Sequence, residues 1–98
     1  MDLLQWLNEW YKAQCNGNWE HCYVVKIETV DNPGWLVTID IAETLLVDKM
    51  FVEYDKCISD NDWIFCLIRD KKFIGSGDPD KLFTILEIFK DWVEKNKE

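Results

Sequence analysis

Residues 18–40 read NWEHCYVVKIETVDNPGWLVTID, and this stretch decides the fold. From Tyr23 onward, just after Trp19-Glu20-His21, apolar and polar residues alternate with the two-residue period of a half-buried β-strand. Asn32-Pro33-Gly34-Trp35 predicts a type II turn, because proline fixes the second turn position and glycine accepts a positive φ at the third. The strand after the turn is predicted to bury Trp35, Val37, Ile39 and Ile41 and to expose Thr38 and Asp40. The stretch therefore predicts a β-hairpin.

Helical periodicity flanks this hairpin at both ends of the chain. In residues 2–15 the apolar side chains recur every three or four positions, at Leu3, Trp6, Leu7, Trp10 and Tyr11. Residues 79–96 show the same spacing at Leu82, Ile85, Leu86, Phe89, Trp92 and Val93. Asp78 is the expected N-cap of this second helix and Pro79 its expected first residue. We expect the helical aromatic residues to lie in the core.

Two further strands are predicted between the hairpin and the last helix. Residues 43–50 form a connection whose Leu45, Leu46 and Val47 are expected to pack onto the core, and a third strand covers about 51–58. A fourth strand runs from Trp63 to Arg69 and is apolar on both faces, whereas residues 75–78 are expected to form a loop. The prediction for residues 1–98 is one α+β domain in two layers, a four-stranded antiparallel meander with an N-terminal and a C-terminal helix, in the order α-β-β-β-β-α.

The bulk composition narrows the classes of partner. The formal net charge is −8, which disfavours direct binding to nucleic-acid phosphates or anionic membranes and favours a basic protein surface. No apolar run approaches the roughly 18 residues of a membrane span, and the N-terminus lacks the basic start of a signal peptide, so we expect a cytoplasmic protein. The four cysteines form no CxxC pair and are expected to be reduced thiols.

The run Glu20-His21-Cys22 invites comparison with a catalytic Cys–His pair or a metal site. Neighbouring residues that enter a strand point to opposite faces, so His21 is poorly placed to activate Cys22. The spacing of the cysteines and His21 matches no zinc-ligand pattern. We therefore expect no catalytic residues, no metal site and no cofactor.

The acidic residues are distributed unevenly. Residues 28–62 hold nine carboxylates against two lysines, a net charge of −7, and the rest of the chain is nearly balanced. A solvated face of this kind is common, but Asp40, Glu53 and Asp55 are also predicted to share one sheet surface. Such a surface would accelerate encounter with a basic partner and make binding sensitive to salt.

Several motifs together resemble immunity protein family fifty-three of bacterial polymorphic-toxin systems. They are Leu4-x-Trp6-Leu7-x-x-Trp10-Tyr11, Asn18-Trp19-Glu20-His21, Lys26-Ile27-Glu28-Thr29-Val30-Asp31-Asn32-Pro33-Gly34-Trp35, Ile39-Asp40, the Trp63 strand and Phe89-x-x-Trp92. The resemblance implies a small cytoplasmic protein without enzymatic activity that protects its producer from a cognate secreted toxin. Many toxins of that type are nucleases with basic surfaces, which would suit the acidic segment; the particular toxin is not implied.

The hypothesis for the mechanism is stoichiometric occlusion of the toxin, by a monomer or a homodimer. The predicted contacts are the charge partners Glu20, Asp31, Asp40, Glu53 and Asp55 and the aromatic anchors Trp19 and Trp35.

Two alternative functions remain open at this stage. An acidic secretion chaperone or adaptor would form a stable homodimer and bind an unfolded export segment instead of a folded toxin. A small hydrolase or transferase using Glu20 and His21 would turn over substrate without a protein partner, but no second acid–base group stands at a suitable position.

Overall fold

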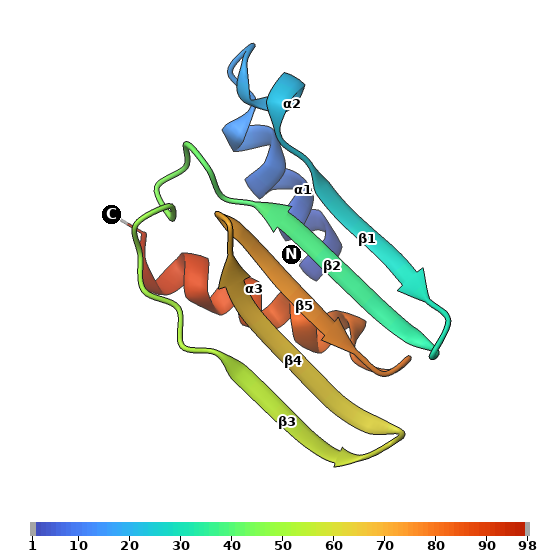
Figure 1. Cartoon of the computed structure of the whole chain (residues 1–98). Coiled ribbons are helices and arrows are strands. Elements are labelled where there is room, and N and C mark those ends of the chain that lie inside the picture. Colours follow the sequence, from blue (N-terminus) through green and yellow to red (C-terminus); the bar gives the residue numbers. More distant parts are fainter. Residues whose placement is uncertain (1, 98) are drawn as a thin grey trace.

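A five-stranded antiparallel sheet carries two helices on one of its faces (Figure 1). The computed structural model describes residues 2–97. Its elements are α1 (Leu3–Gln14), α2 (Trp19–Cys22), β1 (Val25–Val30), β2 (Gly34–Asp40), β3 (Tyr54–Ser59), β4 (Asp62–Arg69), β5 (Lys72–Gly77) and α3 (Leu82–Lys95). The predicted α+β class, the antiparallel sheet and the helices at the two ends are confirmed.

The prediction of a four-stranded meander is wrong in strand number and in order. The sheet order is β1-β2-β5-β4-β3, so β5 lies between the hairpin β1–β2 and strand β4. Residues 41–53 therefore pass the ends of β5 and β4 before they reach β3 at the far edge (Figure 1). The long connection, residues 41–53, therefore leads directly into the edge strand β3.

Strand β5 includes residues that were predicted to form a loop. Asp70 and Lys71 have φ values of 53° and 60° and join β4 to β5 as a two-residue hairpin, although neither is the Gly or Asn typical of such turns. Gly75 lies within the strand, and α3 packs so closely on it that a Cβ would clash with Cγ2 of Ile85. Glycine at this position reflects close packing and not a flexible loop.

The hairpin is confirmed, but its turn is not of type II. Gly34 lies outside the positive-φ region and is the first residue of β2, and the Asn32–Pro33 peptide bond is cis. A Cβ at Gly34 would clash with the carbonyl oxygen of Gly77, so the close approach of β2 and β5 explains why this residue is glycine.

His21 and Cys22 also differ from prediction, since they lie in the short helix α2 and not at the entrance of a strand.

The last helix begins at Leu82, three residues later than predicted, and Asp78 does not cap it directly. The buried Asp78 carboxylate accepts hydrogen bonds from the backbone N–H groups of Trp63 (2.9 Å) and Asp80 (2.8 Å) and from Nζ of Lys81 (2.6 Å). The hydrogen bond from Lys81, followed by those from the backbone, lowers the pKa of Asp78 to about 2. Asp78 therefore ties the start of β4 to the turn before α3.

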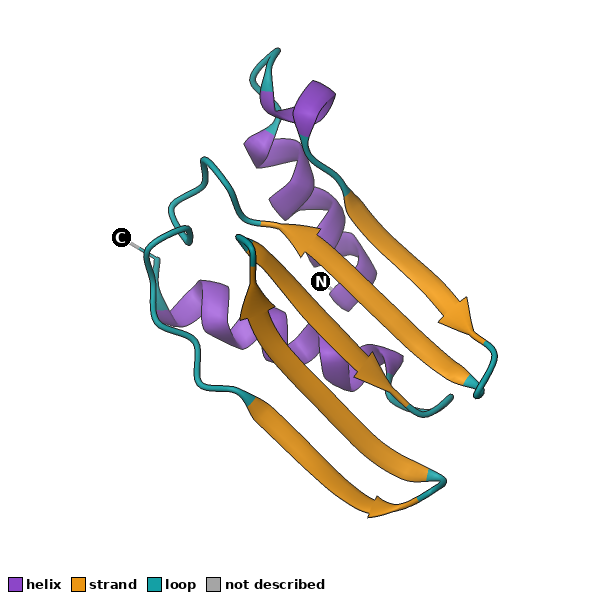
Figure 2. Ribbon diagram, in the orientation of Figure 1, coloured by secondary structure: helices purple, strands orange, loops and turns teal. Residues whose placement is uncertain are grey.

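The core lies between the sheet and the layer formed by α1 and α3, which both cover the same face (Figure 2). Its centre is aromatic: Phe89 meets Trp10 and Phe73 with ring centroids 5.1 Å apart in both pairs, and Trp92 packs on Phe51 at 5.2 Å. The predicted core positions of Trp10, Phe89 and Trp92 are confirmed, and Trp6 is half-buried against them.

Candidate partner-binding surface

Trp19, predicted to be a contact residue, is buried in the core with 3% of its surface exposed. The short helix α2 directs its indole toward Trp10, Tyr11 and Tyr23, with centroid distances of 6.2, 6.1 and 5.7 Å. Its Nε1–H donates a hydrogen bond of 2.9 Å to the backbone carbonyl of Ala42. This geometry joins α1, α2 and the end of β2, so Trp19 has a structural role.

The carboxylate of Glu20 is hydrogen-bonded to the loop that precedes it. Its carboxylate accepts hydrogen bonds from the backbone N–H groups of Asn16 (3.0 Å) and Gly17 (2.9 Å). The backbone N–H groups of Glu20 itself, Asn16 and Gly17 lower the pKa of this carboxyl group. Glu20 thus stabilises the loop between α1 and α2, and a deprotonated carboxylate held in this way is poorly suited to the acid–base chemistry of the hydrolase alternative.

Asp40 was predicted to be exposed, but it is buried with 4% of its surface accessible. Lys72 lies directly opposite on β5 and forms an ion pair of 2.9 Å with its carboxylate, which also accepts the backbone N–H of Val24 at 2.9 Å. Trp35 is half-buried, and its indole N–H donates to the carbonyl of Pro79 at 3.0 Å. Both side chains thus make intramolecular contacts.

The sheet face that points away from the helices does not form a purely acidic surface. The registers place six charged strand residues on it, namely Lys26, Glu28, Asp40, Asp55, Arg69 and Lys72. Three are acidic and three basic, and Asp40 is already paired with Lys72. Asp31 is exposed in the turn after β1, whereas Glu53 and Asp55 lie at the opposite edge of the sheet. The seven predicted contact residues therefore do not form one cluster.

Residues 43–60, which we call the acidic margin, are rich in unpaired carboxylates, although others such as Asp31, Asp70 and Asp91 lie elsewhere. The margin comprises most of the connection after β2, strand β3 and the start of the turn that follows. Within residues 2–97, its five carboxylates are exposed and have no ion pair within 4.0 Å: Glu43, Asp48, Glu53, Asp55 and Asp60. Only Lys49 and Lys56 oppose them in this segment. The margin therefore presents a net negative charge to solvent.

The same segment carries exposed apolar side chains. Six of the eleven large hydrophobic residues that are exposed in the described part of the chain lie in the margin: Leu45, Val47, Met50, Val52, Tyr54 and Ile58. Of the three residues predicted to pack onto the core, Leu46 does so, but Leu45 is 68% exposed and Val47 is 41% exposed. Several exposed apolar side chains along one segment that also carries carboxylates are a feature of protein-interaction surfaces.

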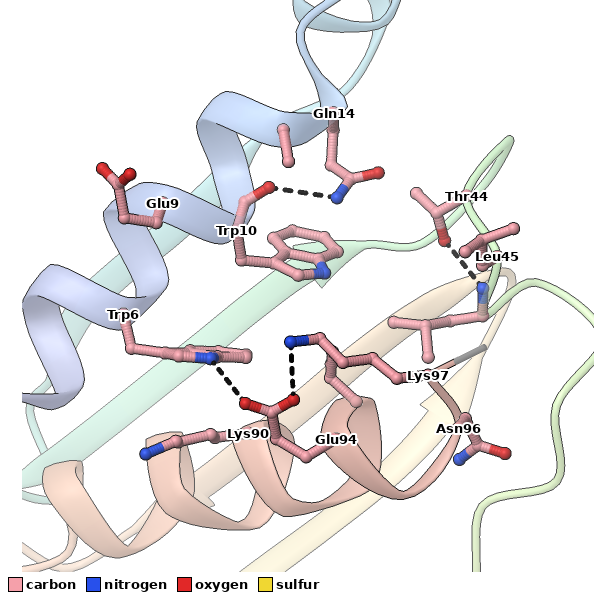
Figure 3. A pocket seen from close by; sticks show the side chains of 13 residues that line it. Trp6, Glu9, Trp10, Gln14, Thr44, Leu45, Lys90, Glu94, Asn96 and Lys97 are labelled. Atoms are coloured by element: carbon pink, nitrogen blue, oxygen red, sulfur yellow. Dashed lines mark hydrogen bonds and ion pairs between the residues drawn. The ribbon is translucent and has the colours of Figure 1, made fainter. Parts of the chain in front are cut away.

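A cavity of about 610 Å³ adjoins the margin between α1, the loop at residues 44–46 and the C-terminal half of α3 (Figure 3). Trp6 and Trp10 line one side and Leu45 another. Glu94 accepts a hydrogen bond from Nε1 of Trp6 at 3.2 Å and pairs with Lys97 at 2.9 Å, and Lys97 is the main cause of the lowered pKa of Glu94. These polar contacts brace the helix pair at the cavity wall.

Metal binding and thiol chemistry find no support in the described residues. No group of three or more His, Cys, Asp or Glu side chains within residues 2–97 is arranged to hold a metal ion. Burial raises the pKa of the Cys66 thiol to about 12, so this cysteine is not an activated nucleophile. No helix of residues 2–97 has the length and hydrophobicity needed to span a membrane.

Comparison with known proteins assigns the family. The family model described as Immunity protein 53 matches residues 4–94, which is nearly the whole chain. No curated protein and no solved structure matches this chain. The matched region includes the whole sheet, the acidic margin and all but one residue of each of the helices α1 and α3. The chain belongs to the immunity protein 53 family.

Proposed function

We propose that this protein neutralises its cognate toxin by forming a stoichiometric complex through the acidic margin. Membership of an immunity-protein family supports an antitoxin role and implies a toxin partner. The observation that carries the proposal is the coincidence, in residues 43–60, of five unpaired exposed carboxylates with six exposed apolar side chains. The apolar groups supply the area that is buried on association, and the carboxylates select a basic partner.

The complementary surface on the toxin would be basic, as the substrate groove of a nuclease is. An acidic protein that covers such a groove competes directly with a phosphate substrate, so binding and inhibition are the same event. Glu53 and Asp55 are the predicted charge contacts retained in this proposal, because both are exposed and lie in the margin. Their carboxylates would accelerate association at low ionic strength.

The test is co-expression with the toxin domain encoded beside the gene. We expect growth to be rescued and a one-to-one complex to be purified from the same cells. Binding by a homodimer to an unfolded export segment, without any complex with the folded toxin domain, would instead support the chaperone alternative. The lack of both rescue and complex with an active toxin would contradict the proposed function.

A further inference from the structure

Strand β3 is an open edge of the sheet. It pairs with β4 on one side, and within residues 2–97 no strand pairs with its other side (Figure 1). All six of its residues are exposed. The opposite edge is less open, since Val25 and Val30 of β1 are half-buried and Val25 lies beside α1. Among the two sheet edges, β3 offers the more accessible row of backbone hydrogen-bonding groups.

The two faces of this edge differ in chemistry. The register pairs Tyr54 with Cys66 of the buried face, and Asp55 with Phe65 of the opposite face. The sequence alternates in the same way just before the strand, where Val52 is apolar and 80% exposed and Glu53 is acidic. In residues 52–55 one side of the edge therefore carries the apolar Val52 and Tyr54, and the other side carries Glu53 and Asp55. Farther along the strand, Lys56 lies on the side of Tyr54.

A second copy of this chain is a poor occupant for the edge. It would bring a second acidic margin, with five carboxylates against two lysines, and a net charge of −8 to the same place. A partner strand of complementary chemistry meets no such repulsion.

We propose that an extended segment of the toxin adds to β3 as a sixth strand of the sheet. This inference rests on the proposed function and specifies how the acidic margin binds. Backbone hydrogen bonds to the free edge of β3 would align the toxin segment with the strand. The segment would alternate basic side chains, facing Glu53 and Asp55, with apolar side chains beside Val52 and Tyr54. Charge complementarity thus selects the toxin over a second copy of the chain.

The experiment is amide hydrogen exchange by NMR on the isotope-labelled protein, alone and in complex with the toxin domain encoded beside the gene. In the free protein, the alternate β3 amides that point away from β4 should exchange rapidly. In the complex we expect their exchange to slow at least about tenfold, with cross-strand contacts between backbone protons of β3 and the toxin, Hα–Hα for an antiparallel strand or amide–Hα for a parallel one. The outward amides of β1 serve as the internal control and should keep their rates.

The outcomes separate this inference from the function on which it rests. If the complex forms and growth is rescued, but the outward β3 amides keep their rates, strand addition is wrong and the proposed function stands. Slowed exchange without cross-strand contacts between backbone protons would also overturn strand addition, because side chains alone would then cover the edge. Failure to form any complex would overturn both proposals.

The side-chain pattern provides a second measurement on the same complex. Val52→Lys places a charge on the apolar side of the edge and should weaken the complex at least about tenfold. Val24→Lys, at a position 49% exposed near the other edge, is the matched control and should bind like the wild type. Equal affinity for the two variants would contradict the proposed orientation of the added strand.

Discussion

Replacement of Trp19 by alanine should destabilise the fold and leave the binding surface intact. The indole is 97% buried, contacts three aromatic rings and donates a hydrogen bond to the Ala42 carbonyl. Removal of a buried aromatic side chain costs about 3–5 kcal/mol, and the Ala42 carbonyl loses its indole donor as well. Domains of this size are stable by about 5–15 kcal/mol, so the variant should remain partly or fully folded in buffer.

Urea denaturation followed by circular dichroism measures this loss. With a denaturant slope of about 1.5 kcal/mol per molar, a loss of about 4 kcal/mol lowers the midpoint by roughly 2–3 M. Trp19→Phe keeps most of the ring but loses the donor, and should cost about 1–3 kcal/mol. The affinity of the folded Trp19→Ala fraction for the toxin should equal that of the wild type. An unchanged midpoint combined with a tenfold loss of affinity would refute the assignment of Trp19 to the core.

Three further predictions concern packing, pH and salt. Gly75→Ala should cost about 2–3 kcal/mol in urea denaturation because its Cβ clashes with Ile85. Gly17→Ala, at φ +93° in open space, should cost only about 1 kcal/mol, and equal costs would contradict the tight β5–α3 contact. Asp78 has a lowered pKa, so its pairing with Lys81 should stabilise the fold fully above about pH 4, its ordinary range, and progressively less as the pH falls toward 2. Asp78→Asn should accordingly lose about 1.5–3 kcal/mol at pH 7 and much less at pH 2.5, and a difference independent of pH would exclude this role. Raising salt from about 50 to 500 mM should weaken the toxin complex at least about tenfold, mainly by slowing association; salt-independent binding would show that the carboxylates do not steer it.

The local elements were predictable from the sequence because periodicity reports which face of an element is buried. The helical spacing of Trp6, Trp10, Phe89 and Trp92 predicted the helix layer, and the alternation through Val37 and Ile39 predicted a core strand. These patterns arise within one element, so they need no knowledge of its neighbours.

Strand β5 and the sheet order could not be predicted in the same way. Gly75 and Gly77 suggest a loop when the sequence is considered alone, and only the closeness of α3 and Lys81 explains why side chains are excluded there. The turn at Asp70 and Lys71 lacks the usual glycine or asparagine, so Asp70 was the only local signal for this hairpin. The position of β5 between β2 and β4 depends on pairing between strands that are distant in the sequence, which the meander prediction did not include.

The candidate surface was predictable only in part for the same reason. The burial of Asp40 depends on Lys72, which lies on the strand that was not predicted. Glu53 and Asp55 remain exposed because no element covers the outer edge of β3 within residues 2–97. The apolar part of the margin was present in the sequence as Leu45, Met50, Val52 and Ile58, but its exposure became evident only from the path of residues 41–53 across the sheet.

The most direct measurement is the association rate of the toxin domain with a pair of double charge-reversal variants. Glu53→Lys with Asp55→Lys changes the margin, and Asp80→Lys with Asp91→Lys changes the net charge equally at exposed positions outside it. At low salt we predict that the margin variant associates at least about tenfold more slowly and fails to rescue growth, while the control variant stays within about threefold of the wild type. Equal slowing of the two variants, or full rescue by the margin variant, would contradict binding through the acidic margin.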